Sequence, residues 1–226
     1  MKNSINLNEY IDHTLLKSDA TLAMIEKLCQ EAKKAYFKTV CINPFYVKHA
    51  ASLLADSNLK VCTVVGFPLG ANATSTKVQE TITAIKAGAT EIDVVINIGA
   101  LKDNNQAVVL QDLQDVRAVC PKNIILKVII ECALLNEEEK IIACQLVTKA
   151  QADFIKTSSG FAGGGATVAD IKLMKANIGP NVAIKASGGI KTKDDALAMI
   201  AAGATRIGTS NGILIIDNQH VANDGY

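Results

Sequence analysis

Residues 60–97 read KVCTVVGFPLGANATSTKVQETITAIKAGATEIDVVIN, in which two short runs rich in Val and Ile enclose a longer amphipathic stretch. Thr76 and Gln79 have the spacing of an N-terminal capping box. The glycine of KAGAT, at 86–90, is typical of a helix end that leads into a strand. This segment therefore predicts a strand, a helix and a second strand, which is the repeating unit of parallel sheets.

The same alternation continues along most of the chain. Helix starts are indicated by Ser18-Asp19, by Asn136 before a run of glutamates, and by Thr167 and Thr192, each of which precedes an aspartate by three residues. The segment AAGAT at 201–205 repeats the glycine signal for a helix end. Strands are predicted at 10–15, 38–43, 60–66, 91–97, 124–131, 153–158, 182–187 and 206–210.

Eight strands separated by helices favour one α/β domain, a closed (β/α)₈ or TIM barrel, over an open doubly wound sheet. A chain of 226 residues is long enough for one such barrel and leaves no room for a second domain. We expect the barrel to occupy residues 1–217. The pattern is lost after Ile216, which predicts a flexible C-terminal tail at 218–226.

Composition excludes several classes of function. Lys and Arg (23) nearly balance Asp and Glu (22), and only two of the cations are arginines, so a nucleic-acid-binding face is not expected. Neither a signal peptide nor a stretch long enough to span a membrane is found. The six cysteines form no CxxC pair and lie in apolar segments, which predicts free, buried thiols and a cytoplasmic location. The three histidines have no metal-ligand spacing, so neither a metal nor another cofactor is expected.

Side chains alternate across a strand, which divides each predicted strand into an aliphatic set facing the helices and a mixed set facing the barrel interior. Lys127, Lys156 and Lys185 stand 29 residues apart on three successive strands, so their amines should converge near Asp93. Burial and like charge both favour the neutral, nucleophilic form of an amine. The interior sets collect Asp12, Cys41, Asp93, Asn97, Lys127, Lys156, Lys185 and Ser187.

Glycine-rich turns follow the last three predicted strands, as SSGFAGGG (158–165), SGGI (187–190) and GTSNG (208–212). In barrels of this kind such turns bind phosphate through bare backbone N–H groups, although tight turns without a ligand remain an alternative. Converging lysines beside a phosphate site predict Schiff-base chemistry on a small phosphorylated carbonyl compound. Asp12 stays open between a turn residue and a site carboxylate, and Cys41 between packing and the pocket. The predicted substrate-binding residues are Lys127, Asp12, Cys41, Thr157, Ser187, Gly188, Gly189, Gly208 and Ser210.

Several ordered segments resemble the deoxyribose-phosphate aldolases in their shorter bacterial form. The resemblance runs from about residue 7 to residue 216 and is most specific in the segments EIDVVINIGA, IKTSSGF and IKASGGI. It implies a class I aldolase that reversibly cleaves 2-deoxy-D-ribose 5-phosphate into acetaldehyde and D-glyceraldehyde 3-phosphate. By match to the family's motifs, Lys156 would form the Schiff base, and Lys185 and Asp93 would transfer protons. The resemblance also implies a homodimer or homotetramer.

Three departures from the family's pattern concern the substrate. Phe161 stands where the longer form of the family has a lysine, and Asn211 replaces a serine in GTSNG. Tyr226 matches a C-terminal tyrosine that assists proton transfer in some relatives, although a frayed terminus is the alternative. Two other functions remain open: a phosphosugar isomerase with Glu131 as base, and a non-catalytic barrel that binds sugar phosphates.

Overall fold

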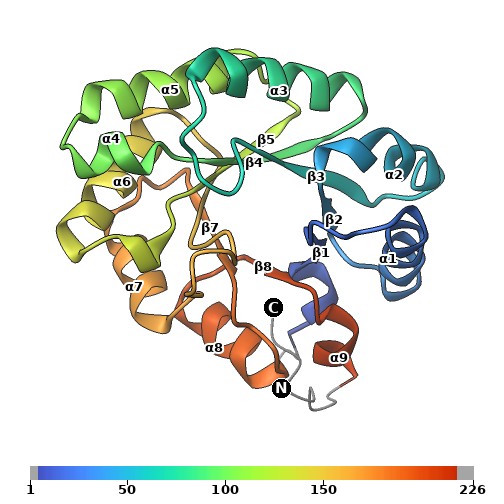
Figure 1. Cartoon of the computed structure of the whole chain (residues 1–226). Coiled ribbons are helices and arrows are strands. Elements are labelled where there is room, and N and C mark those ends of the chain that lie inside the picture. Colours follow the sequence, from blue (N-terminus) through green and yellow to red (C-terminus); the bar gives the residue numbers. More distant parts are fainter. Residues whose placement is uncertain (1–4, 218–226) are drawn as a thin grey trace.

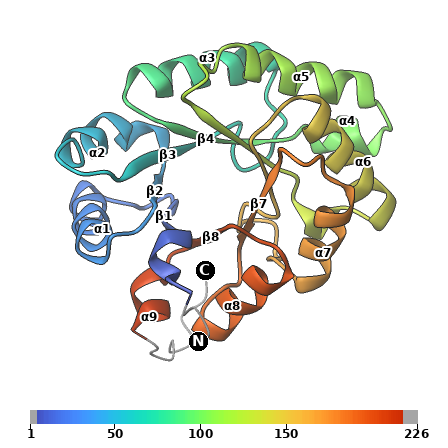
Figure 2. The same ribbon diagram turned by 180° about the vertical axis from the view of Figure 1, so that it is seen from behind.

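The eight strands form one closed parallel barrel in the order β1 to β8, and β8 pairs with β1. The computed structural model describes residues 5–217, so the predicted tail at 218–226, Tyr226 included, lies outside the described residues. Helices surround the strands as a continuous ring in Figure 1, and Figure 2 shows the same ring from behind. This arrangement confirms the predicted (β/α)₈ barrel.

All eight predicted strands are present, each shorter than its apolar run because the ends lie outside the hydrogen-bonded ladder. The segment 153–158, for example, contributes only three residues to the sheet. The strands are β1 (Ile11–Leu15), β2 (Thr39–Ile42), β3 (Lys60–Val65), β4 (Glu91–Val95), β5 (Ile125–Ile129), β6 (Phe154–Lys156), β7 (Ala183–Ser187) and β8 (Arg206–Thr209).

The helices follow the strands and cover the outside of the barrel. Three short 3₁₀ segments, η1 (Leu7–Tyr10), η2 (Pro44–Tyr46) and η3 (Cys132–Leu134), lie in the connections. Within residues 5–217, no helix is both long and apolar enough to cross a bilayer. The α-helices are α1 (Leu22–Ala35), α2 (Val47–Leu53), α3 (Thr74–Lys86), α4 (Ile98–Lys102), α5 (Gln106–Ala118), α6 (Glu137–Lys149), α7 (Val168–Asn177), α8 (Lys193–Ala202) and α9 (Gly212–Ile216).

Three of the predicted helix starts are confirmed and two are wrong. Asn136, Thr167 and Thr192 cap α6, α7 and α8, each accepting a hydrogen bond from the third backbone N–H of its helix. Helix α1 is capped by Thr21 rather than by Ser18-Asp19.

Helix α3 begins at Thr74, so Thr76 lies inside the helix and forms no capping box. The reason is tertiary. Thr74 Oγ1 and Lys77 Nζ donate to the two carboxylate oxygens of Asp112 in α5, at 2.8 and 2.6 Å. These contacts hold the first turn of α3 three residues earlier than a cap at Thr76 predicts.

The two faces of the strands carry different chemistry, as alternation requires. The aliphatic set of β5, including Leu126 and Val128, packs against the surrounding helices in the main hydrophobic core. A second, small apolar cluster of Leu16, Cys41, Cys62 and Val64 lies beside Asp93. All six cysteines are free and buried, as predicted.

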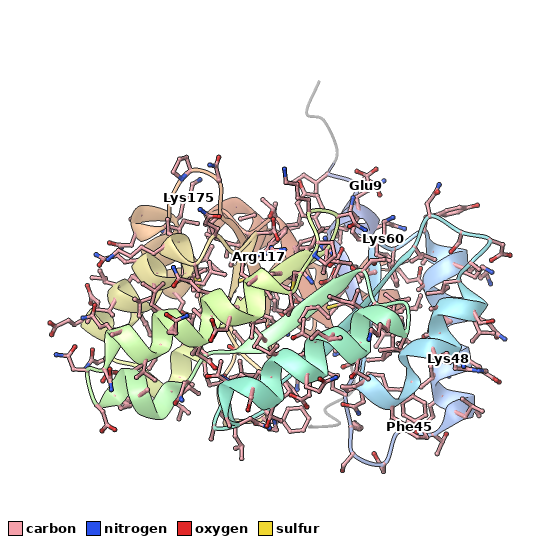
Figure 3. The ribbon with its side chains drawn as sticks, turned by 90° about the horizontal axis from the view of Figure 1, so that it is seen from above. Glu9, Phe45, Lys48, Lys60, Arg117 and Lys175 are labelled. Atoms are coloured by element: carbon pink, nitrogen blue, oxygen red, sulfur yellow. The ribbon has the colours of Figure 1, made fainter. Side chains whose placement is uncertain are left out.

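The two ends of the barrel can be followed in Figure 3. Glu9 and Lys60, which stand before β1 and at the start of β3, lie at one end, and Phe45, which follows β2, lies at the other. The end with Phe45 is therefore the carboxyl end of the strands, where barrel enzymes carry their active sites.

Candidate active site

Three lysine amines meet at a single carboxylate inside the barrel. Lys127 Nζ lies 2.7 Å from Asp93 Oδ1, and the Nζ atoms of Lys156 and Lys185 each lie 2.8 Å from Asp93 Oδ2. All four residues are buried, with at most 2% of any one exposed. The predicted convergence of the three lysines on Asp93 is therefore present.

The three lysines do not stand at the same register. Lys156 pairs with Lys185 across β6 and β7, whereas Lys127 pairs with Phe154 and, on its other side, with Asp93. Lys127 thus lies two residues nearer the amino ends of the strands than Lys156 does. Lys156 is the last residue of β6, which places its amine on the side of the barrel mouth.

Two further carboxylates and an arginine complete the polar interior. Lys185 Nζ lies 2.6 Å from Asp12 Oδ2, and Lys127 Nζ lies 2.6 Å from Glu91 Oε2. Arg206 bridges the same two carboxylates, at 2.5 Å from Asp12 Oδ1 and 2.9 Å from Glu91 Oε2. Asp12 therefore lies inside the barrel in contact with Lys185 and Arg206. We call the closed sequence of alternating charges the charge ring; its members are Arg206, Asp12, Lys185, Asp93, Lys127 and Glu91.

Sequence reasoning missed Arg206 and Glu91. Glu91 shares its face of β4 with Asp93, so alternation could have found it. Arg206 is the first residue of β8 and is 4% exposed, with its guanidinium 5.8 Å from the centre of the Phe154 ring. A charged residue at a strand start is ordinarily solvated, and only closure of the barrel turns this one inward.

The charge ring fixes the protonation of its members. Burial opposes ionisation of Asp93, but Lys127, Lys156 and Lys185 outweigh it and hold the Asp93 pKa well below its usual range. Burial likewise opposes the charged form of Lys185, yet Asp12 and Asp93 raise its pKa. The pKa of Lys127 is raised in the same way by Asp93. The expectation that all three amines favour the neutral form is therefore wrong for these two lysines, because carboxylates outweigh burial.

Cys41 lies within this centre beside a second thiol that the sequence did not single out. A hydrogen bond with Cys62 lowers the pKa of Cys41 to about 7, against the effect of burial. Cys62 Sγ in turn lies 3.0 Å from Asp93 Oδ1. Cys41, Cys62 and Asp93 are close enough together to hold a metal ion. Both Asp93 oxygens already accept hydrogen bonds from ammonium groups, whose charge disfavours a cation there.

The predicted substrate-binding residues fall into two groups. Thr157 and Ser187 lock the ends of β6 and β7 together, since Ser187 N–H donates to Thr157 Oγ1 and Thr157 Oγ1 donates to Ser187 O. Gly188 and Gly189 follow with left-handed backbone (φ 81° and 74°), which glycine adopts without strain. Their position at the carboxyl ends of the strands is the one from which a phosphate can be reached.

The other predicted positions have different surroundings. Gly208 lies within β8, and a Cβ there would stand 3.0 Å from Lys185 Cε, so this glycine makes room for the lysine side chain. Ser210 follows β8 and is exposed. Asn97 does not join the interior set, because its side chain accepts a hydrogen bond from Ala100 N–H and caps α4.

The mouth of the barrel is lined by the loops that follow β1 and β6. A pocket of about 640 Å³ lies between Lys17 and Ser18 on one side and Gly160 and Phe161 on the other. Phe161 is 46% exposed, and its ring meets that of Phe67, which follows β3, edge to face at 5.2 Å. Phe161 therefore brings an aromatic contact, and no charge, to this pocket.

Glu131, the base of the alternative isomerase, does not contact the charge ring. Its backbone is left-handed (φ 55°), and both carboxylate oxygens accept a hydrogen bond from Ser159 N–H, at 3.2 and 3.1 Å. Ser159 stands three residues after Lys156. The contacts of Glu131 are thus those of a residue that holds the loop after β6.

Comparison with known proteins identifies the family of the chain. The sequence model of the DeoC/LacD family aldolases matches residues 7–220. The chain belongs to this family of aldolases. Its relatives include the deoxyribose-phosphate aldolases of Brevibacillus brevis, 54% identical over 98% of this chain and 100% of the relative, and of a Geobacillus species, 55% identical over 98% and 99%.

Solved structures place the family's barrel over nearly the whole chain. The aldolase QR15 superposes with a TM-score of 0.91 at 41% identity, covering 95% of this chain and 96% of QR15. The deoxyribose phosphate aldolase of Aeropyrum pernix, described as a tetramer, superposes at 0.87 with 30% identity, covering 93% and 89%. The family's fold therefore accounts for the described barrel from β1 to β8.

Proposed function

We propose that this aldolase cleaves 2-deoxy-D-ribose 5-phosphate reversibly into acetaldehyde and D-glyceraldehyde 3-phosphate through a Schiff base on Lys156. The observation that carries the proposal is the meeting of three amines at Asp93, with Lys156 on the side of the barrel mouth. The substrate is that of the deoxyribose-phosphate aldolases that are more than half identical to this chain. This is a class of reaction that needs a neutral amine and a proton relay and no cofactor.

The contacts distinguish Lys156 from the other two lysines. Lys127 and Lys185 each touch two carboxylates, whereas Lys156 touches, among the carboxylates of residues 5–217, Asp93 alone and shares its Oδ2 atom with Lys185. The charge ring is balanced without Lys156, since it contains three cations and three carboxylates. Lys156 is therefore the amine that the ring does not need as a cation, and we assign it as the nucleophile.

The first steps follow from that neutral amine. Lys156 Nζ attacks C1 of the open-chain sugar, and loss of water leaves an iminium that draws electrons from the C2–C3 bond. A base takes the proton of the C3 hydroxyl, the C2–C3 bond breaks, and glyceraldehyde 3-phosphate leaves with a new aldehyde at C3. The electron pair of the broken bond remains as an enamine on Lys156.

Asp93 and Lys185 are placed to carry the protons. Asp93 Oδ2 touches both Lys156 and Lys185, so a proton can pass between the nucleophile and its neighbour through one oxygen. We assign this pair, acting through a water, to protonate the hydroxyl that leaves as the iminium forms. Lys185, neutral after that step, receives the C3 hydroxyl proton and returns it to C2 of the enamine. Water then hydrolyses the iminium and releases acetaldehyde. Lys127, on the other oxygen of Asp93, holds that carboxylate ionised.

The phosphate is assigned to the carboxyl ends of β7 and β8. The left-handed backbone at Gly188 and Gly189 forms a concavity of the kind that binds anions through N–H groups. Ser187 and Ser210 stand at the ends of the same two strands and supply hydroxyl groups beside it. Phe161 contributes no charge, so the backbone carries more of the phosphate binding than in the longer form of the family.

Borohydride trapping tests the proposal. The protein is incubated with acetaldehyde, reduced with borohydride, digested and analysed by mass spectrometry for an ethyl group on lysine. An adduct confined to Lys156 is expected. An adduct chiefly on Lys127 or Lys185 would overturn the assignment of roles. No selective adduct would contradict the aldolase reaction and leave the isomerase or the non-catalytic barrel.

Assembly and location are proposed on separate grounds. We infer a homodimer or homotetramer, supported by the tetrameric Aeropyrum pernix relative and by two exposed apolar side chains, Phe45 (87%) and Leu69 (72%), on neighbouring connections. Sedimentation of the purified protein as a monomer at micromolar concentration would contradict this. The cytoplasmic location is supported by six unpaired cysteines, which suit a reducing compartment.

A further inference from the structure

Arg206 is deeply buried in the barrel and touches no group that the reaction uses directly. We propose that it is a positioning residue for the Schiff-base lysine: by neutralising Asp12 and Glu91, it leaves the three lysines short of negative charge and makes Lys156 the uncharged amine. This inference rests on the proposed function. It assigns a catalytic consequence to a side chain at the start of β8, away from the substrate.

The first step is the geometry of the guanidinium. Arg206 Nε and Nη2 both contact Asp12 Oδ1, and Nη2 also donates to Glu91 Oε2 at 2.9 Å. Thr39 Oγ1 accepts from the same guanidinium and donates to Asp12 Oδ1. A planar fork with several donors can bridge two carboxylates in this way, which a lysine ammonium on a flexible stem does less rigidly.

The second step is the charge balance. Three carboxylates and the thiols of Cys41 and Cys62 face the three lysines. Below the Cys41 pKa of about 7 both thiols are neutral, so without Arg206 each lysine would have one negative charge to match it. All three would then be held as ammonium ions, and the site would lack a nucleophile at neutral pH. Arg206 adds a fourth cation, so one positive charge is in excess. The lysine with the fewest carboxylate contacts, Lys156, is the one that gives it up.

The third step weighs a purely structural role. A buried ion cluster stabilises a fold weakly or not at all, because desolvation of the charges offsets their attraction. The Oε1 atom of Glu91 has no hydrogen-bond donor among the described residues, which adds to that cost. Stability alone therefore gives little reason to bury Arg206 and Glu91 beneath the catalytic lysines.

Two substitutions test the proposal because they shift the charge in opposite directions. Arg206→Met removes a cation, so Lys156 should stay protonated to higher pH. The acid limb of a pH profile is the fall in activity or trapping as pH decreases. The midpoint of this limb, for kcat/KM and for borohydride trapping at Lys156, should then rise by about one pH unit. Glu91→Gln removes an anion, and both limbs should move down by a similar amount. Arg206→Lys restores the charge and should return the limb most of the way.

A matched control is available outside the barrel interior. Lys77 and Asp112 form another buried ion pair, 2.6 Å apart, that contacts no member of the charge ring. Asp112→Asn should lower the melting temperature and leave both limbs in place. If Arg206→Met and Glu91→Gln do the same, the ion cluster is structural and the inference is overturned.

The outcomes also separate this inference from the proposed function. No trapping at Lys156 in the unmodified enzyme at any pH contradicts the function itself. Trapping at Lys156 with coincident acid limbs in all folded variants overturns only the role of Arg206. If one of the two charge-changing variants does not fold, as judged by circular dichroism, the other carries the test alone. Its acid limb should move by about one pH unit in the direction given above, and a folded variant whose limb coincides with that of the unmodified enzyme overturns the inference.

Discussion

Lys156 and Lys185 contact the same oxygen atom: each Nζ lies 2.8 Å from Oδ2 of Asp93. Two ammonium groups so close to one oxygen would repel each other across a buried site. Lys185 has a second carboxylate in Asp12, whereas Lys156 has none within the part of the chain that the structure describes. The pair is therefore suited to a division of roles, in which Lys185 is charged before the reaction begins and Lys156 reacts as an amine.

Lys156→Arg should abolish aldol cleavage although it keeps the positive charge. A guanidinium is never neutral at working pH and cannot form the imine, so we expect kcat to fall by at least about 10³-fold. Coupled assay of released glyceraldehyde 3-phosphate measures it. Lys48→Arg, at an exposed position on α2 (Figure 3), is the matched control and should retain full activity. Near-normal turnover of Lys156→Arg would remove this lysine from the nucleophile role.

Gly208→Ala should impair catalysis by displacing Lys185. The added Cβ would lie 3.0 Å from both Lys185 Cε and Ser187 Cβ, so the lysine must shift by several tenths of an ångström. We expect kcat to fall about tenfold, since misplaced proton-transfer groups lose much of their effect. Gly99→Ala is the control, because a Cβ there meets nothing closer than 3.7 Å. Unchanged kcat in Gly208→Ala would show that Lys185 tolerates displacement.

Much of this site follows from alternation along single strands, and the remainder depends on how the strands pair. Alternation predicts that four side chains point into the barrel, because each shares a strand with an aliphatic set that must face the helices. They are Asp93, Lys127, Lys156 and Lys185. Alternation does not predict their relative positions along the barrel axis. Although the three lysines are equally spaced by 29 residues, Lys127 pairs with Phe154, whereas Lys156 pairs with Lys185. Register is a tertiary property that local sequence does not specify.

Contacts between distant segments limited the prediction elsewhere. The predicted cap at Thr76 does not form, because Thr74 and Lys77 bond to Asp112 and start the helix earlier. Asp112 lies 35 residues beyond Lys77 in the sequence. Arg206 contacts Asp12 across 194 residues, because closure of the barrel brings the last strand beside the first. The fold class can be predicted from the periodicity of the sequence alone. The charge ring can be predicted only once the closure of the barrel is known.

His13 should make the stability of the barrel depend on pH below about 6.5. Burial lowers its pKa below the usual 6.5, although a hydrogen bond with Glu31 on α1 opposes this. The unfolded chain therefore binds a proton more readily than the folded one. Stability contributed by neutral His13 is complete above pH 6.5 and is lost as pH falls toward the folded value.

Urea unfolding at a series of pH values measures this slope. His13→Gln should flatten it below about pH 6.5, whereas His49→Gln, at a partly exposed site on α2, should leave it in place. A slope that survives His13→Gln would assign the pH dependence to other groups.

Phe161→Lys should increase the preference for phosphorylated substrates. Phe161 stands at the mouth beside Gly160 and contributes no charge to an anion. An ammonium there would add a charge-assisted contact of about 1 kcal/mol, so KM for 2-deoxyribose 5-phosphate should fall about fivefold. KM for unphosphorylated 2-deoxyribose should not fall, and the gain should diminish with added salt.

Phe161→Leu separates charge from the loss of the aromatic contact with Phe67, whose ring lies 5.2 Å away. Equal changes in KM for the two substrates in Phe161→Lys, or the same change in Phe161→Leu, would place the phosphate out of reach of this loop. The selective and salt-sensitive result would instead assign the loop after β6 to phosphate binding.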